Sequence, residues 1–97
     1  MVRLTVLYNR PEDTAAFDKH YNEIHIPLAK KLPGLVRYTV SRNLRSEEYY
    51  LVAELDWEDM AALRTAMGSP AGAEATADVA KFATAGSSSL IYEVAEV

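Results

Sequence analysis

The chain has 97 residues, no cysteine and a formal net charge of −4 at pH 7. This length suits one domain spanning residues 1–97, and a chain without cysteine has no disulfides. The ten basic residues are scattered, which argues against nucleic acid as a partner. The sequence shows no charged and apolar leader and no apolar run of about 18 residues, so we expect a cytoplasmic protein with no membrane partner.

The first third of the chain predicts a strand followed by a helix. Residues Val2–Tyr8 alternate with the period of a strand, and Asp13 or Thr14 can cap the helix that follows. Apolar side chains then recur at helical spacing and form one stripe that must face a core. The members of this stripe are Phe17, Tyr21, Ile24, Leu28 and Leu32.

Two histidines flank this stripe beside a proline. Projected at ~100° per residue, His25 lies to one side of the stripe and His20 to the other, where the helix meets its neighbours. Pro27 lacks an N–H and leaves the Glu23 carbonyl without a helical partner, so we expect a kink or break at Ile26. A break would place His25 in the last turn of a helical segment, where the helix dipole favours an imidazolium.

The middle of the chain predicts a hairpin and the start of a second helix. Pro33-Gly34 ends the first helix, and Leu35–Leu44 and Tyr49–Asp56 are predicted to form two strands of a hairpin. Asp56 with Asp59 resembles a capping box with the shorter acid in place of glutamate. A helix therefore follows, with one apolar face made by Met60, Leu63 and Met67.

The last third predicts a further helical piece and a final strand. Gly68 ends the preceding piece, and Ser69-Pro70 restarts the chain as a helix because proline fits the first turn. Ser88–Val94 then forms the last strand. The apolar stripe of the second helical piece consists of Ala75, Val79 and Phe82.

The element order is strand, helix, strand, strand, helix, strand. Two right-handed crossovers give an α+β, ferredoxin-like domain, with a four-stranded antiparallel sheet and helices on one face. The first three strands carry apolar or aromatic residues on both sides, as Leu51 and Val52 illustrate. A monomer would expose this second face, so we expect an obligate homodimer with an interface of ~2,000 Å2 or more.

These features resemble the EthD family of the dimeric α+β barrel superfamily, over nearly the whole chain. The resemblance rests on Phe17 and Tyr21, on His25-Ile26-Pro27-Leu28, on Leu32-Pro33-Gly34-Leu35 with Tyr38, and on Ser69-Pro70, Asp78 and Phe82. It implies a homodimer whose two sheets form a barrel, and a pocket between each sheet and its helices. It also implies that His25 is the family's most recurrent polar pocket residue.

Candidate site residues follow from the pattern and the resemblance together. His25 is the candidate catalytic residue, and the alternative is a satisfied boundary histidine. We expect His20 to be a surface or boundary residue. Asp78 lies on the flank of its helix's stripe and is a candidate partner that orients the imidazole, the alternatives being a solvated charge or a helix-end contact. The candidate ligand-binding tyrosines, for which packing is the alternative role, are Tyr8, Tyr21, Tyr38 and Tyr92.

The two histidines do not predict a metal site. Zinc ligands on one helix normally lie four residues apart on one face, whereas His20 and His25 are five apart and are predicted to diverge. The chain has no cysteine and no third histidine. We therefore expect neither a metal nor a cofactor.

The EthD-like fold implies no settled reaction, because related barrels include polyketide cyclases, decarboxylating or dehydrating enzymes, cofactor-free monooxygenases and haem-degrading enzymes. Our leading hypothesis is a cofactor-free enzyme that acts on an aromatic or polyketide-like hydrophobic molecule. In this hypothesis, His25 moves a proton in a cyclase, dehydratase or decarboxylase type of reaction.

The alternative is a non-catalytic binding or accessory protein of a degradation or biosynthetic pathway. A monooxygenase is a weaker alternative, since a haem-degrading one needs an axial histidine in the later helical region, which has none.

Overall fold

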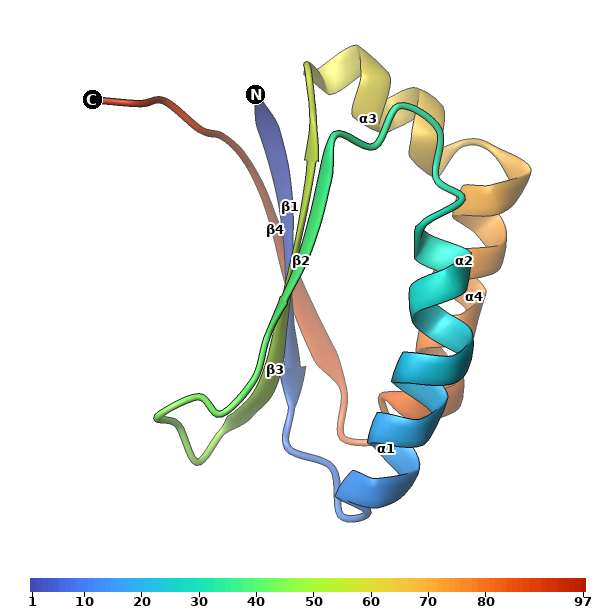
Figure 1. Cartoon of the computed structure of the whole chain (residues 1–97), viewed down its shortest axis with the longest axis vertical. Helices are drawn as coiled ribbons and strands as arrows, with labels where there is room; N and C mark the ends of the chain where they lie inside the picture. The colour runs from blue at the N-terminus through green and yellow to red at the C-terminus, as the bar shows by residue number, and fades with distance from the viewer.

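Four strands form one antiparallel sheet, and all the helices cover the same face of it (Figure 1). The computed structural model describes residues 1–97. The strands are β1 (Val2–Asn9), β2 (Arg37–Ser41), β3 (Tyr49–Trp57) and β4 (Ser87–Glu93), in the order β2-β3-β1-β4. This is the predicted ferredoxin-like arrangement.

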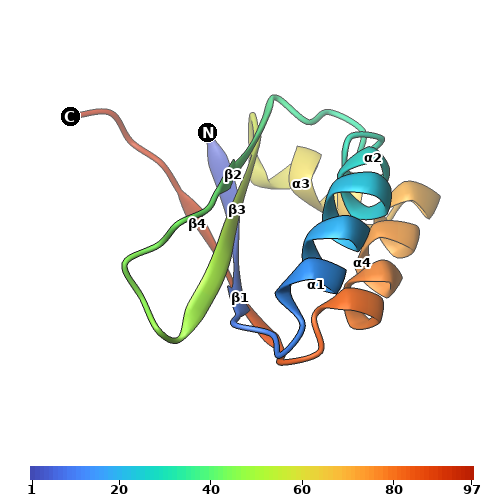
Figure 2. The ribbon, with the colours of Figure 1, turned by 60° about the horizontal axis from the view of Figure 1, so that its bottom comes forward.

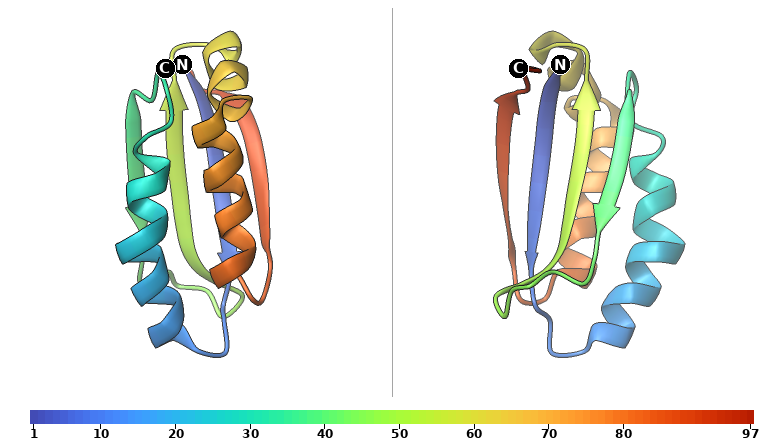
Figure 3. Two further views of the ribbon diagram at one scale, coloured as in Figure 1. Left: turned by 90° about the vertical axis from the view of Figure 1, so that its right-hand side faces the viewer. Right: turned by 60° about the vertical axis from the view of Figure 1, so that its left-hand side comes forward.

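The sheet register decides which side chains face the helices. In the centre, β1 pairs with β3 through Val6 and Ala53 and with β4 through Leu4 and Ile91 (Figure 3). Because side chains alternate along a strand, Leu4, Val6 and Tyr8 share the helix-covered face. The strand β4 lies at the edge of the sheet, and all seven of its residues are exposed.

The helices pack beside one another over this face (Figure 2). They are α1 (Thr14–His20), a π-helical turn η1 (Tyr21–His25), α2 (Ile26–Ala29), α3 (Met60–Met67) and α4 (Pro70–Phe82). Three side chains cap helix starts by accepting a backbone N–H, namely Asp13, Asp59 and Ser69. None of these helices combines the length and apolar character needed to cross a membrane.

Two boundaries differ from the prediction. Asp56 does not cap α3, because it lies in β3 and accepts two hydrogen bonds from the Arg3 guanidinium at 2.8 and 3.1 Å. The predicted strand Leu35–Leu44 is shorter in the structure, where β2 is followed by a turn in which Asn43 has a left-handed φ of 57°.

The first helix does not break at Ile26. That residue has α-helical angles, φ −57° and ψ −48°, and its N–H donates to the Tyr21 carbonyl five residues back. In an α-helix the Pro27 ring would clash with the Glu23 carbonyl, and the wider π turn moves that carbonyl away. The extra residue in the turn therefore accommodates the proline without ending the helix.

This π turn also changes which side chains face the core. The predicted stripe continues through Ile24 and Leu28, but Ile24 is 46% exposed, whereas His25 and Ala29 are buried. Phe17 and Tyr21, which precede the shift, are buried as predicted. The imidazole of His25 thus lies inside the molecule and not on the flank of the helix.

Candidate functional site

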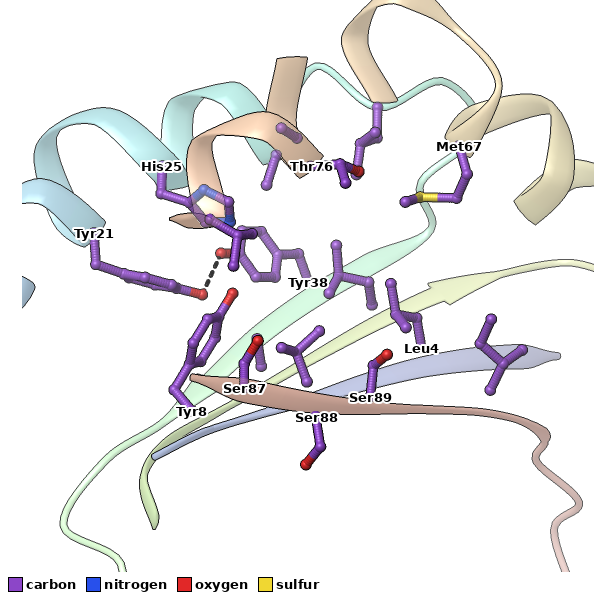
Figure 4. Close-up of a pocket in the computed structure, with 18 residues that line it drawn as sticks. Leu4, Tyr8, Tyr21, His25, Tyr38, Met67, Thr76, Ser87, Ser88 and Ser89 are labelled. Atoms are coloured by element: carbon purple, nitrogen blue, oxygen red, sulfur yellow. Dashed lines mark hydrogen bonds between the residues drawn. The ribbon is translucent and has the colours of Figure 1, made fainter. Parts of the chain in front are cut away.

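A cavity of about 350 Å3 lies between the sheet and the helices (Figure 4). One end is polar and is formed by His25 and the hydroxyl groups of three tyrosines, Tyr8, Tyr21 and Tyr38. The rest of the wall is mostly apolar and includes Leu4, Leu32, Leu55, Met67, Val79 and Ile91, with hydroxyl groups from Thr76 and the serines of β4. No lysine, arginine, aspartate or glutamate lines the cavity. The site therefore suits a molecule with an uncharged, largely apolar body.

His25 is held at the cavity wall by a carboxylate from the neighbouring helix α4. Its Nδ1 atom lies 3.0 Å from Oδ2 of Asp78, and the Phe82 ring lies 4.7 Å from the imidazole, centroid to centroid. The Nε2 atom has no hydrogen-bond partner within the chain. An imidazole bonded through Nδ1 to a carboxylate offers Nε2 to a ligand, which is the arrangement a general base requires.

The same carboxylate also binds the second histidine. Oδ1 of Asp78 lies 2.9 Å from Nε2 of His20, so each carboxylate oxygen has its own imidazole. The expectation that His20 and His25 diverge is wrong, because the π turn between them brings two residues five apart to one side of the helix. Asp78 is 3% exposed, which excludes the solvated charge that the sequence left open.

Burial favours the uncharged form of His25. Desolvation lowers its pKa below the ordinary value and outweighs the hydrogen bond and charge of Asp78, which act in the opposite direction. Burial raises the pKa of Asp78, but the hydrogen bonds from His20 and His25 outweigh it, and the result lies below the usual value. At neutral pH the pair is therefore a neutral imidazole whose Nδ1–H donates to a carboxylate.

The three tyrosines differ in how their hydroxyl groups are used. The hydroxyl groups of Tyr21 and Tyr38 lie 2.7 Å apart and form a hydrogen bond (Figure 4). Tyr8 is 2% exposed and points its hydroxyl to the cavity, where it has no partner within the chain. Burial raises the pKa of Tyr8 and of Tyr21, so both remain protonated at neutral pH.

Tyr92 does not line the cavity, in contrast to the prediction. It faces the other side of the sheet, where its hydroxyl lies 2.7 Å from the hydroxyl of Thr5. The register explains this position, because Tyr92 pairs with Arg3, and residues of that parity point away from the helices.

Two features of the site were not predicted. Ser87 and Ser89 line the cavity, although the sequence indicates only that this serine run enters a strand. Period-2 alternation with Ile91 would have placed both serines on the cavity side. The contact of His20 with Asp78 had no sequence signal, since a regular helix separates the two histidines.

No group of three or more histidines, aspartates or glutamates is arranged to hold a metal ion.

The fold and this pocket together define a small ferredoxin-like domain with a histidine and aspartate pair at an apolar cavity. The EthD domain model matches residues 9–86, and the chain therefore belongs to the EthD family, which confirms the resemblance. An uncharacterized 11.0 kDa protein from the thcB-thcC intergenic region of Rhodococcus erythropolis is 39% identical, with 89% of this chain and 87% of that protein covered.

Two solved structures are similar, one in family and fold and the other in fold alone. The crystal structure of an ethyl tert-butyl ether d (EthD) family protein from Bacillus halodurans is similar, with a TM-score of 0.92 and 37% identity over 98% of this chain and 99% of that one. A dimeric ferredoxin-like protein of unknown function from Thermobifida fusca shares the fold, with a TM-score of 0.76, 17% identity, and coverage of 96% of this chain and 90% of that one.

Proposed function

We propose that the chain is a small-molecule enzyme in which His25 moves a proton at the carbon next to a carbonyl group. The observation that carries the proposal is the buried pair of His25 and Asp78, with Nε2 left for the apolar cavity. Such a base works without a bound cofactor and contributes roughly 10²- to 10⁴-fold to the rate of a proton transfer.

The proposed step uses two groups of the polar end. His25 Nε2 takes the proton from the carbon, and the electron pair of the broken C–H bond forms the C=C bond of an enolate. The carbonyl oxygen gains the negative charge and accepts a hydrogen bond from the Tyr8 hydroxyl, which has no other partner. Aldol cyclisation and loss of water both pass through such an enolate, which fits a cyclase or dehydratase.

The cavity lining supports a substrate with an apolar body and an uncharged oxygen function at one end. Aliphatic side chains such as Leu55 and Met67 surround the body, whereas tyrosine hydroxyl groups and His25 meet the oxygen. A carboxylate would enter without any cation to offset its desolvation, which costs several kcal/mol. Bicyclic or larger aromatic and polyketide-like ketones have the proposed combination of groups.

We further propose that the chain acts as a homodimer. The similar protein from Thermobifida fusca is described as dimeric, and this chain exposes apolar residues on the edge strand β4. Leu90 and Tyr92 lie on the face away from the helices and are 58% and 39% exposed. A second copy against the open face of the sheet would bury part of this surface.

Deuterium exchange into 2-tetralone tests the catalytic proposal directly, because this neutral bicyclic ketone has exchangeable protons next to its carbonyl. Proton NMR in D2O would follow the exchange rate with the wild-type protein, with His25→Gln and with the control Tyr92→Phe, whose hydroxyl is outside the cavity. We expect exchange that depends on the protein, is unaffected in the control, and falls by about 10²-fold or more in His25→Gln.

The same experiment separates the alternatives. Saturable binding of 2-tetralone without exchange would support a binding or accessory protein and contradict the catalytic role of His25. Exchange that persists in His25→Gln would assign the base to another residue. The charged analogue 2-naphthoate should bind much more weakly than 2-tetralone, and equal binding would contradict the proposed substrate class.

A further inference from the structure

We infer that His20 is a positioning residue for His25. By occupying Oδ1 of Asp78, His20 leaves Oδ2 as the oxygen that faces His25 Nδ1, and this keeps Nε2 of His25 free of a proton and directed to the cavity. The inference rests on the proposed function, since a fixed tautomer matters only if His25 Nε2 meets a substrate.

The geometry gives the carboxylate little freedom to turn. Asp78 is 3% exposed, and each of its two oxygens is held by one imidazole, at 2.9 and 3.0 Å. Phe82 packs against both imidazoles, with ring centroids 5.4 Å from His20 and 4.7 Å from His25. Without His20, the carboxylate could rotate about its Cβ–Cγ bond and would hold His25 less firmly.

The two histidines meet different surroundings. The side chain of His25 is 8% exposed and faces the main cavity, whereas that of His20 is 22% exposed. His20 lines a second, smaller cavity of about 220 Å3, together with Asp13, Lys81 and Thr84. His20 is therefore the more solvent-accessible of the two imidazoles.

A charge on His20 affects the pKa of His25, because both imidazoles contact the Asp78 carboxylate. The groups that face His20 are Asp78 and Lys81 from α4 and Asp13 from the turn before α1, and those that face His25 are Asp78 and the tyrosine hydroxyl groups of the cavity. A proton on His20 offsets the negative charge of Asp78 and so disfavours a proton on His25. A positive charge on His20 therefore lowers the pKa of His25.

Histidine NMR measures both effects without any substrate. The chain has two histidines, so each 15N imidazole signal is assigned by a single variant. The variants are His20→Gln, which keeps an N–H donor but loses the titratable ring, and His20→Ala, which loses both. Lys19→Gln is the control, because it removes an exposed charge from the same helix.

In the wild type and in Lys19→Gln, we expect His25 to carry its proton on Nδ1 at neutral pH. His20→Gln should preserve that tautomer and move the His25 titration to higher pH, because the imidazole whose charge lowers the pKa of His25 is gone. His20→Ala should populate the Nε2–H tautomer to a measurable extent. Should the alanine variant fail to fold, as judged from its amide spectrum, His20→Gln still gives the test.

Two results would overturn the inference. One is an unchanged His25 tautomer in folded His20→Ala, which would reduce His20 to a packing residue. The other is a His25 titration in His20→Gln that matches the wild type, which would show that the two rings are uncoupled. Because these signals need no turnover, a His20 effect on His25 without deuterium exchange would fault the proposed reaction and leave the positioning role intact.

Discussion

His25 can be neutral or protonated, and its burial favours the neutral form. The folded chain lowers the pKa of His25, whereas the unfolded chain leaves it near its ordinary value of 6.5. The unfolded state therefore binds more protons as the pH falls below that value, and folding stability decreases. The depressed pKa of Asp78 acts in the same direction at lower pH, below its ordinary value of 3.8.

This linkage predicts how stability depends on pH. The free energy of unfolding, measured by urea denaturation, should fall between pH 7 and pH 5 in the wild-type protein. His25→Gln should flatten this fall, since it removes the group that gains a proton on unfolding, and Lys19→Gln should keep it. Parallel pH dependences in wild type and His25→Gln would contradict the assigned direction of the pKa shift.

Phenylalanine variants of the tyrosines at the polar end of the cavity should distinguish a structural hydroxyl group from a ligand-binding one. Tyr21→Phe removes a hydrogen bond with Tyr38 and should cost about 1 kcal/mol of stability. Tyr8→Phe removes a hydroxyl without a partner in the chain and should change stability by less than about 0.5 kcal/mol, while weakening 2-tetralone binding. Denaturation and binding measured on both variants check the contrast, and a larger stability loss in Tyr8→Phe would contradict it.

At the scale of elements, the π turn is the feature that assembles the site. Residues Tyr21–His25 insert one extra residue ahead of Pro27, which buries His25 in place of Ile24 and brings His20 to the same carboxylate. Such turns are rare and often occur at functional sites. The proline and the position of the imidazole are therefore linked.

Replacing the proline should disturb that link. Pro27→Ala restores a backbone N–H and removes the ring that would clash with the Glu23 carbonyl in a regular α-helix, so the segment can adopt that helix. We expect His25 to lose its contact with Asp78 and its 15N signals to become those of an exposed imidazole, with overall stability nearly unchanged. Unaltered His25 signals in Pro27→Ala would show that other contacts hold the π turn.

The sequence predicted the elements well because each has a local signal. Alternation predicted β1, and the cap Asp13 and the pair Ser69-Pro70 predicted two helix starts. The burial of His25 could not be predicted, because helical projection assumes 100° per residue and one π turn displaces every later position. The shared use of Asp78 was likewise hidden, since it depends on how two helices pack.

At the scale of the whole molecule, the open sheet face and the edge strand β4 determine the expected assembly. This face is polar in part, since Arg3 lies between Glu54 and Asp56 at 3.0 and 2.8 Å, and apolar along β4. Light scattering should give twice the chain mass of 10.8 kDa at micromolar concentration. A persistent monomer under those conditions would contradict the proposed homodimer.

The central claim is that His25 presents Nε2 to a ligand in the apolar cavity. The most direct measurement is a titration of histidine-labelled protein with 2-naphthol, a stable analogue of the enol form of the ketone, followed through the 15N signal of His25 Nε2. We predict a saturable shift of that signal, with much smaller changes at His20. Saturable binding that is visible in the ligand's own NMR signals but leaves His25 Nε2 unchanged would contradict the claim, as would the absence of binding.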